Sequence, residues 1–256
     1  MKYMQRRKHF LVALNGSASG YHALTEAIRL AQWNKGEVTA ITVTPPYLGD
    51  LNLTGVKDVQ SLMVGFAGEI LDKAYKAGSS LGMRINIRCE AGEPETEIAA
   101  FYARGQFDAV VLGATRRSGM AGFLLGNTRL KIIRSLDETE VLMIPEQASV
   151  GWEKILLVMD ETDQDAEILK RAAELARSYG GELTIQRLSN NFSARRKKTG
   201  APDSGKADMI LQRIRTENFQ MVILSRKVGR RRSLIRIGLT DGIIAQNRPV
   251  LILRKL

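Results

Sequence analysis

Hydrophobic residues along this chain fall into short runs that alternate with longer amphipathic stretches. Residues 10–14 form a short apolar run, and the polar turn Asn15-Gly16-Ser17 follows it, which predicts a strand and then a loop. Apolar residues next recur at helical spacing until Asn34-Lys35-Gly36, with Ser19 as the expected N-cap. The chain therefore opens with a predicted strand, turn and helix.

The same alternation continues to about residue 147. A β-branched stretch predicts a second strand over residues 37–43, and Pro45-Pro46 ends it because proline cannot continue a central ladder. Proline and carboxylates in the first turn predict a helix that begins near Glu93-Pro94-Glu95. The other expected elements are helices over residues 56–77 and 124–136 and strands over residues 85–87, 108–112 and 141–144. Such alternation predicts a parallel sheet with helices on both faces.

The pattern then starts again, which predicts a second copy of the same fold. Residues 155–159 repeat the first strand, residues 168–179 repeat the first helix, and Gly180-Gly181-Glu182 echoes Lys35-Gly36-Glu37. Further matches join residues 219–224 with 107–112, and residues 247–253 with the end of the first half.

The second copy differs from the first between residues 188 and 206. This segment is polar and basic and contains Arg195-Arg196-Lys197-Lys198, so we expect a mobile loop where the first copy has its long helix and third strand. The predicted fold is thus two doubly wound α/β domains of the adenine nucleotide α-hydrolase-like or flavodoxin-like kind. They cover residues 1–147 and residues 151–256, and the second is shortened.

Charge is divided unevenly between the two halves. The chain has a net charge of +11, but residues 1–150 hold 17 Lys and Arg against 15 Asp and Glu, whereas residues 151–256 hold 21 against 12. A basic second domain favours phosphate-rich or acidic partners, which include nucleic acid, an acidic protein and an anionic membrane surface. A solvated basic face without a partner remains the alternative.

Targeting and redox signals are absent from the sequence. No apolar run approaches the roughly 20 residues that span a bilayer, and the basic start of the chain precedes a strand and no signal-peptide core. The single cysteine, Cys89, excludes an intrachain disulfide framework. We therefore expect a cytoplasmic protein without a transmembrane segment.

The loops after the first and fourth strands are the candidate ligand site, because doubly wound sheets bind ligands where the strand order reverses. The first strand ends in Asn15-Gly16-Ser17, and the fourth is followed by Gly113-Ala-Thr-Arg116, nine residues, and Gly126-Asn127-Thr128. This spacing resembles that of the universal stress protein family, which has an Asp-Gly-Ser-like turn and then the pattern G-x2-G-x9-G-[ST]. Arg116 replaces the second glycine, and Asn15 replaces the aspartate.

The resemblance implies an ATP site in the first domain, with Mg²⁺ as the accompanying ion. Glycines in such a loop let backbone N–H groups approach phosphate oxygens at a helix N-terminus. Carried over position by position, the implied contacts are Ala13, Asn15, the backbone at Val43, Gly113, Arg116, Gly126, Asn127, Thr128 and Arg129. The alternative is that these glycines only allow a tight connection from strand to helix.

The second domain keeps only one of the three glycines in register, Gly238. Ser225 and Val228 stand at the first two positions, and the loop Arg226-Lys227-Val228-Gly229-Arg230-Arg231-Arg232 is strongly basic. We expect no ATP site there. The loop fits phosphate backbones, although no helix-turn-helix or zinc spacing supports base recognition.

Catalytic and metal motifs are also missing. The sequence has no P-loop, no G-x-G-x-x-G after a strand and no nucleophile elbow, and neither His9 nor His22 belongs to a triad. The acidic run Asp160-Glu161-Thr162-Asp163 precedes a helix, where carboxylates usually cap it or face its dipole. We expect no enzyme, with weak ATP hydrolysis or AMP transfer as a lesser alternative.

Two hypotheses of function follow. In the first, a stress-response protein binds ATP in its first domain with little or no turnover; in the second, a nucleotide-free module docks a partner through its basic second domain. The direction of the Arg116 side chain discriminates between them, because a side chain inside the loop would fill the phosphate space. The family resemblance further implies an intrachain pseudo-dimer through the last strands at residues 141–144 and 250–253, and leaves a homodimer open.

Overall fold

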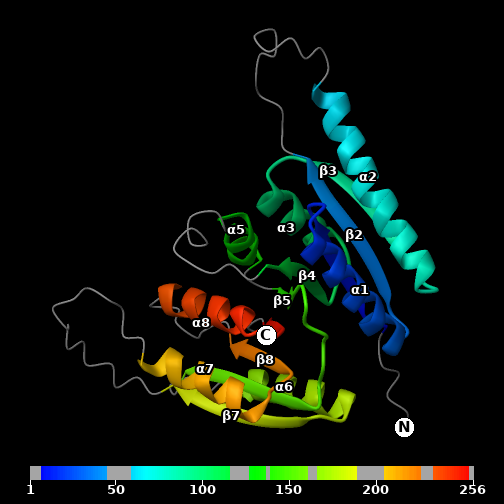
Figure 1. The fold of residues 1–256 in the computed structure, drawn as a ribbon. Helices are drawn as coiled ribbons and strands as arrows, with labels where there is room; N and C mark the ends of the chain where they lie inside the picture. Colours follow the sequence, from blue (N-terminus) through cyan, green and yellow to red (C-terminus); the bar gives the residue numbers. More distant parts are fainter. Residues whose placement is uncertain are drawn as a thin grey trace, which may run out of the picture. The chain divides into compact units, whose positions relative to one another are not determined.

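The chain forms two compact α/β units. The structure is a computed structural model, and it describes residues 7–44, 59–115, 127–136, 139–160, 166–188, 205–225 and 233–253 (Figure 1). Unit 1 lies within Met1–Ala114 and Gly119–Val141, and unit 2 within Thr115–Ser118 and Leu142–Leu256.

Unit 1 is built on a parallel sheet in the order β3-β2-β1-β4. Its strands are β1 (His9–Leu14), β2 (Glu37–Thr44), β3 (Asn86–Ala91) and β4 (Ala109–Ala114). Leu11 and Val12 on β1 and Val110 and Val111 on β4 are completely buried, because helices cover both faces of these central strands. Runs of aliphatic residues without alternation are expected of such strands.

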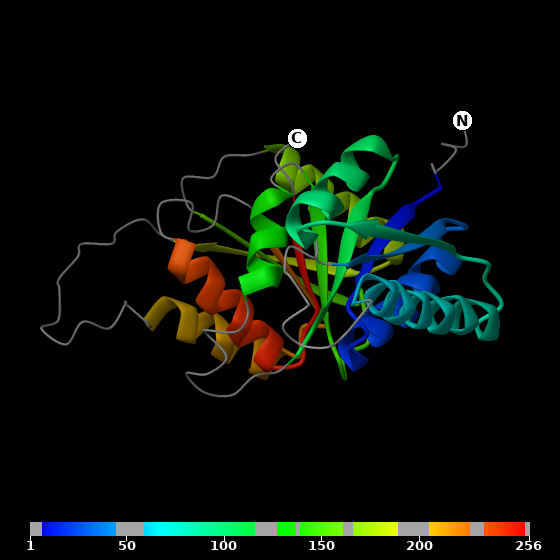
Figure 2. The same cartoon turned by 90° about the horizontal axis from the view of Figure 1, so that it is seen from above.

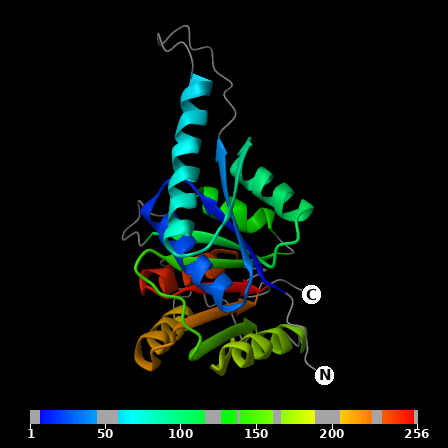
Figure 3. The ribbon, with the colours of Figure 1, turned by 90° about the vertical axis from the view of Figure 1, so that its right-hand side faces the viewer.

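The helices of unit 1 lie on both sides of this sheet. Their bounds are α1 (Ala18–Trp33), α2 (Val59–Ser80), α3 (Pro94–Arg104) and α5 (Asn127–Ser135). Helix α1 packs beside α2, and α3 packs beside α5 on the opposite face (Figures 1 and 3). The predicted doubly wound α/β fold is therefore confirmed for this unit.

The start of α1 corrects one detail of the sequence analysis. Ser17, not Ser19, is the N-cap: the Ser17 hydroxyl accepts a hydrogen bond from the Gly20 amide at 3.2 Å, and the helix begins at Ala18. Ser19 is instead buried in the first turn. Both serines precede the apolar pattern, so periodicity alone does not separate them.

Unit 2 is built on a second parallel sheet in the order β9-β8-β6-β7. Its strands are β6 (Lys154–Asp160), β7 (Glu182–Leu188), β8 (Met221–Ser225) and β9 (Val250–Leu253), and its helices are α6 (Ala166–Tyr179), α7 (Gly205–Glu217) and α8 (Ser233–Ala245). Helices α7 and α8 pack side by side (Figure 2), and α6 lies on the other face of the sheet (Figure 3). Strand β5 (Glu140–Pro145) is buried at every residue, and from Leu142 it belongs to this unit.

Unit 2 repeats the strand register of unit 1. Lys154 pairs with Glu182 as His9 pairs with Glu37, with both positions 145 residues later. Ile155 pairs with Met221 as Phe10 pairs with Ala109, but the second partner is only 112 residues later. The two shifts differ by 33 residues, which are missing from unit 2 between β7 and β8.

The missing residues correspond to α2 and β3. In unit 1 these elements stand between β2 and α3, whereas in unit 2 only residues 189–204 connect β7 with α7. The sequence predicted this loss. The predicted mobile loop itself lies outside the described residues, as does residue 56, the expected start of the long helix.

Among the described residues, no helix is long and apolar enough to cross a membrane.

Candidate functional site

Three of the implied site residues meet at the carboxyl edge of the unit 1 sheet. Ala13 lies near the end of β1 and pairs with Ile41 on β2 and with Leu112 on β4. Val43 and Gly113 follow those partners at the ends of their strands. Because parallel strands end at one edge, the structure brings Ala13, Val43 and Gly113 together there.

Asn15 shapes the turn between β1 and α1. Its side-chain oxygen Oδ1 accepts a hydrogen bond from the Ser17 amide at 3.2 Å, which is an Asx turn, and the residue is exposed to solvent. The Ser17 hydroxyl in turn lies 3.1 Å from that of Ser19. Asn15 therefore holds the loop through a neutral amide, where the family has a carboxylate.

Helix α2 packs against the same turn, a contact that sequence reasoning missed. Gly16 has a φ of +78°, and a Cβ placed there would lie 3.2 Å from Cδ1 of Ile70. The Tyr21 hydroxyl donates to the Ile70 carbonyl at 3.3 Å, and the Lys73 ammonium lies 4.2 Å above the Tyr21 ring. About fifty residues separate these partners, and no spacing in the sequence points to the contact.

Gly113 has a steric reason to be glycine. A Cβ at this position would lie 2.4 Å from the Ser19 carbonyl oxygen and 2.6 Å from the Gly20 amide nitrogen. The end of β4 therefore touches the backbone of the first turn of α1 directly. This contact closes the switch point, since β1 and β4 are neighbours on which the chain reverses its order.

Helix α5 brings the next implied residues to the unit. Asn127 is its first residue, Thr128 belongs to its first turn, and Arg129 already has an interaction partner. Arg116 and Gly126 lie outside the described residues, so the prediction that rests on the Arg116 side chain stays a prediction.

Electrostatics favours an anion near α1 and α5. Neither helix has an acidic residue in its first turn, so no carboxylate offsets the positive end of either dipole there. Helix α3 differs, because Glu95 and Glu97 stand in its first turn. Glu95 pairs with Lys131 of α5 at 3.0 Å; hydrogen bonding by its own backbone and by Lys131 lowers the pKa of Glu95, and the pair raises the pKa of Lys131.

Unit 2 does not rebuild this edge. Ser225 stands at the end of β8, where Gly113 stands in unit 1, and its side chain is completely buried. A side chain at this place would collide with the helix backbone in unit 1, so the close contact of strand and helix is specific to unit 1. Val228 and the basic loop of residues 226–232 lie outside the described residues, and Gly238 lies within α8.

The remaining candidate groups lie elsewhere. His9 starts β1 at the opposite edge, where Nε2 lies 2.8 Å from the Thr39 hydroxyl and burial lowers its pKa below the ordinary value, although Glu37 and Asp108 act to raise it. Asp108 also receives hydrogen bonds from the Lys8 ammonium at 2.9 Å and the His9 amide at 2.8 Å. Within the described part of the chain, no three His, Cys, Asp or Glu residues gather as metal ligands.

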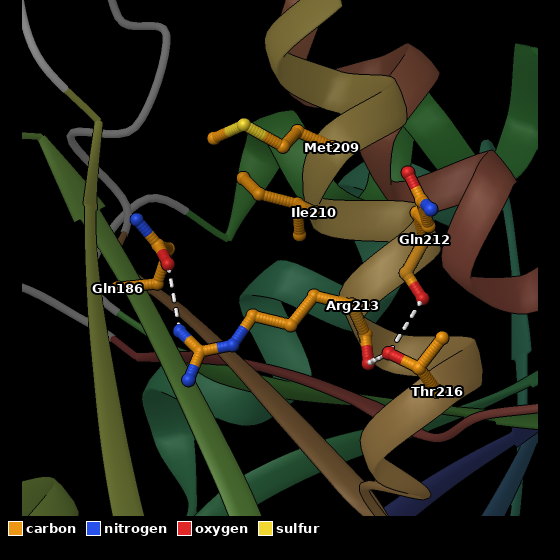
Figure 4. A pocket seen from close by; sticks show the side chains of 6 residues that line it. All are labelled: Gln186, Met209, Ile210, Gln212, Arg213 and Thr216. Atoms are coloured by element: carbon orange, nitrogen blue, oxygen red, sulfur yellow. Dashed lines mark hydrogen bonds between the residues drawn. The ribbon is translucent and has the colours of Figure 1, made fainter.

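A separate pocket of about 270 Å³ opens between β7 and α7 in unit 2 (Figure 4). The Arg213 guanidinium donates to Gln186 Oε1 at 2.7 Å and to Glu217 Oε1 at 2.6 Å, so its charge is already paired. Met209 stands exposed at the rim. No sequence motif indicated this pocket, and it does not coincide with the implied site.

Comparison with known proteins identifies the family. Residues 6–145 match the universal stress protein family, which is more than half of the chain. Over 131 residues the sequence is 29% identical to "Universal stress protein MJ0531" of Methanocaldococcus jannaschii, and the match covers 50% of this chain and 76% of that protein.

Two solved structures resemble nearly the whole chain. A universal stress protein from Archaeoglobus fulgidus has a TM-score of 0.69 at 14% identity, covering 98% of this chain and 100% of its own. Protein PA1789 from Pseudomonas aeruginosa, of unknown function, has a TM-score of 0.56 at 16% identity, covering 98% and 94%. These likenesses show the fold, and together with the sequence match over residues 6–145 they lead to one conclusion: the chain belongs to the universal stress protein family.

Proposed function

We propose that unit 1 binds an adenine nucleotide, ATP with Mg²⁺, and that the protein is a stress-response regulator with little or no turnover. The nucleotide would lie at the carboxyl edge of the unit 1 sheet. Ala13, Asn15 and Val43 would contact the nucleoside, and Gly113 with the start of α5 would approach the phosphates. Arg116 and the residues from Gly126 to Arg129 complete this proposed set.

The observation that carries the proposal is the contact between Gly113 and the first turn of α1. Because Gly113 lacks a side chain, the end of β4 lies against the backbone of Ser19 and Gly20 at the switch point of the sheet. The first turn of α1 holds no carboxylate that would repel an anion. Phosphate groups favour such an edge, where backbone amides and helix dipoles supply positive potential.

The metal ion would arrive with the nucleotide. Asn15 offers one neutral oxygen, which already accepts a hydrogen bond, and the described residues form no acidic cluster. Mg²⁺ usually keeps several waters and binds substrate phosphates with one or two protein ligands, so this edge suits a nucleotide-held ion. The supply of charge to the phosphates is the chemistry the ion would provide.

The pairing of the two copies through β5 and β9 is a further part of the proposal. Strand β5 is buried at every position and groups with unit 2 from Leu142 onwards, together with β9. A strand buried on both faces needs neighbours, which supports exchange of the last strand between copies. In this account the bound nucleotide biases the pairing or the choice of partner.

Isothermal titration of the full chain, stripped of nucleotide, tests the binding. ATP with Mg²⁺ should bind saturably with a dissociation constant in the micromolar range, about 7–8 kcal/mol of binding free energy. AMP should bind more weakly, because it lacks the phosphates that the start of α5 would contact. Absence of heat with millimolar ATP, from a sample folded by circular dichroism, would refute the proposal.

Turnover is tested apart from binding. Release of inorganic phosphate from saturating ATP should not exceed the background rate, because no sequence motif positions a general base or nucleophile at this edge. Release that rises with protein concentration and disappears in the Gly126→Asp variant would show hydrolysis and overturn this half of the proposal.

A further inference from the structure

Strand β7 of unit 2 presents a partly apolar face to solvent. Gln186 receives a hydrogen bond from Arg213 of α7, so its side chain lies on the α7 side of the sheet. Side chains alternate along a strand, and Ile185 therefore lies on the opposite side, beside α6. Ile185 is 45% exposed, although a central aliphatic strand residue in such a fold is usually buried.

Unit 1 covers the equivalent positions. Thr39 contacts His9, whose ring packs on Phe107 beside α3, which places Thr39 on the α3 side of β2. Val38, Ala40 and Thr42 thus lie on the other side, and none of them is more than 3% exposed. The common strand register sets these three equivalent to Leu183, Ile185 and Arg187 of β7.

Helix α2 supplies this cover in unit 1. It packs on β2 and beside α1, and its buried row includes Ala67, Leu71 and Ala74. Along α1, Tyr21 bonds to the Ile70 carbonyl and Gln32 bonds to the Leu81 carbonyl at 2.6 Å, so α2 lies along α1 from its middle to its end. The described part of unit 2 has no helix at this place, because the register leaves out the residues equivalent to α2.

The side of α6 that would meet such a helix is basic. The turn after α6 repeats that after α1, since the Gly181 amide bonds to the Ala176 carbonyl as the Gly36 amide bonds to the Ala31 carbonyl. This register sets Thr25, Ile28 and Gln32 of α1 equivalent to Lys170, Ala173 and Arg177. The α6–β7 face, as we call it, consists of Lys170, Ala173, Arg177, Leu183, Ile185 and Arg187.

This face combines an apolar centre with an exposed basic rim. Lys170, Arg177 and Arg187 are all exposed, and they surround Ile185. Glu174 is a half-buried acidic neighbour on α6, and it leaves the three cations in excess. The connecting residues 189–204 hold four Lys and Arg against one Asp, so like charge disfavours this segment as the cover.

We propose that the α6–β7 face docks an acidic amphipathic helix of another protein, at the place that α2 takes in unit 1. The apolar row of the helix would cover Ile185 and Leu183, as Ala67, Leu71 and Ala74 cover β2. Carboxylates beside that row would pair with the basic rim. Recognition of this kind places an amphipathic helix in an apolar groove and uses charge for specificity. The site is independent of nucleotide binding in unit 1.

A synthetic peptide with an acidic version of the α2 sequence is the probe. We would label residues 59–80 as a free peptide carrying Lys73→Glu and Lys76→Glu, and titrate the full chain while following fluorescence anisotropy. Binding should be saturable, should weaken as salt is raised, and should exceed that of a scrambled peptide of the same composition. Ile185→Glu and Lys170→Glu should each weaken it by about tenfold or more, because one removes the apolar contact and the other reverses a rim charge.

Matched controls stand on the opposite face of the same unit. Met209→Glu changes an exposed apolar residue on α7, and Arg215→Glu reverses an exposed charge there, so neither should alter peptide binding. If Ile185→Glu does not fold, Ile185→Thr and Arg177→Glu carry the same test. Equal losses in the control variants, or no saturable binding, would overturn the proposal.

Other occupants give different results, and each would overturn it. If a second copy covers the face, the wild-type chain will dimerise and Ile185→Glu will release monomers. If residues 189–204 cover it, the peptide will bind only after residues 190–203 are replaced by a short glycine-serine linker. If nucleic acid binds there, a single-stranded RNA oligonucleotide will displace the peptide, and its binding will fall in Ile185→Glu.

Discussion

Gly113 and Ser19 touch through their backbones: a Cβ on Gly113 would lie 2.4 Å from the Ser19 carbonyl oxygen. Gly113→Ser should therefore force β4 and α1 apart and destabilise the chain by about 1–3 kcal/mol, the usual range for overpacking. Urea unfolding followed by circular dichroism measures the change. The same variant should weaken ATP binding, because it moves the edge where the nucleotide would lie.

Gly68→Ala is the control for that substitution. No atom lies within 4 Å of a Cβ at Gly68, which stands on the exposed side of α2. Alanine should stabilise the helix here by about 0.5–1 kcal/mol, since it removes the backbone freedom of glycine in the unfolded chain. If Gly113→Ser were as harmless as Gly68→Ala, the close contact between β4 and α1 would be wrong.

Gly36 and Gly181 test whether the two units are copies of one fold. A Cβ on Gly36 would lie 2.0 Å from the Lys8 carbonyl oxygen, and one on Gly181 would lie 1.7 Å from that of Trp152. The amides of Glu37 and Glu182 bond to the carbonyls of Lys8 and Glu153, each at 2.7 Å. Alanine at either glycine should cost about 3 kcal/mol or more, because a backbone atom has to move.

Fluorescence reports this loss for unit 2 separately. The chain has two tryptophans, and Trp152 of unit 2 stacks on Tyr179 with ring centroids 4.3 Å apart. In a Trp33→Phe background, Gly181→Ala should lower the urea midpoint of the Trp152 signal. A midpoint that does not change in Gly181→Ala would contradict the shared geometry.

Stability should fall on mild acidification because of His9. Burial lowers the pKa of His9 in the folded chain below its ordinary value of 6.5. The unfolded chain then binds a proton at a higher pH than the folded chain does, so lowering the pH through 6.5 favours unfolding. The contribution is complete above this pH and is lost as the pH falls through the lowered folded-state pKa.

Urea unfolding between about pH 7.5 and pH 5.5 measures this contribution. His9→Gln retains a polar partner for Thr39 without a titrating ring, and it should flatten the dependence of unfolding free energy on pH. His22→Gln is the control, because it leaves the ring of His9 in place. A wild-type profile that is flat over this interval would show that His9 does not titrate as its burial requires.

The order of strands and helices was predictable because hydrophobic period separates the two kinds of element. The predicted strand over residues 37–43 became β2 (Glu37–Thr44), and the helix over residues 168–179 became α6 (Ala166–Tyr179). The third strand is longer than its predicted residues 85–87: β3 continues to Ala91, which pairs with Thr44. Pairing with β2 determines that length, and local period does not record it.

The candidate site was predictable only in part. Loop spacing indicated Gly113 correctly as a position where the chain comes close to another segment, and strand order brought Ala13 and Val43 beside it. The contact of Ile70 with Gly16 depends on where α2 packs, which no local pattern encodes. Helix α7 was not predicted at all, and with it the bond from Arg213 to Gln186 was missed.

Titration of ATP with Mg²⁺ into a pair of aspartate variants tests the central claim most directly. Gly126→Asp places a carboxylate immediately before α5, where Asp favours helix initiation but repels phosphate. Gly238→Asp makes the same change at the equivalent position of unit 2. We predict that wild type and Gly238→Asp bind ATP alike and that Gly126→Asp does not. Unchanged binding by a folded Gly126→Asp variant would contradict a nucleotide site in unit 1.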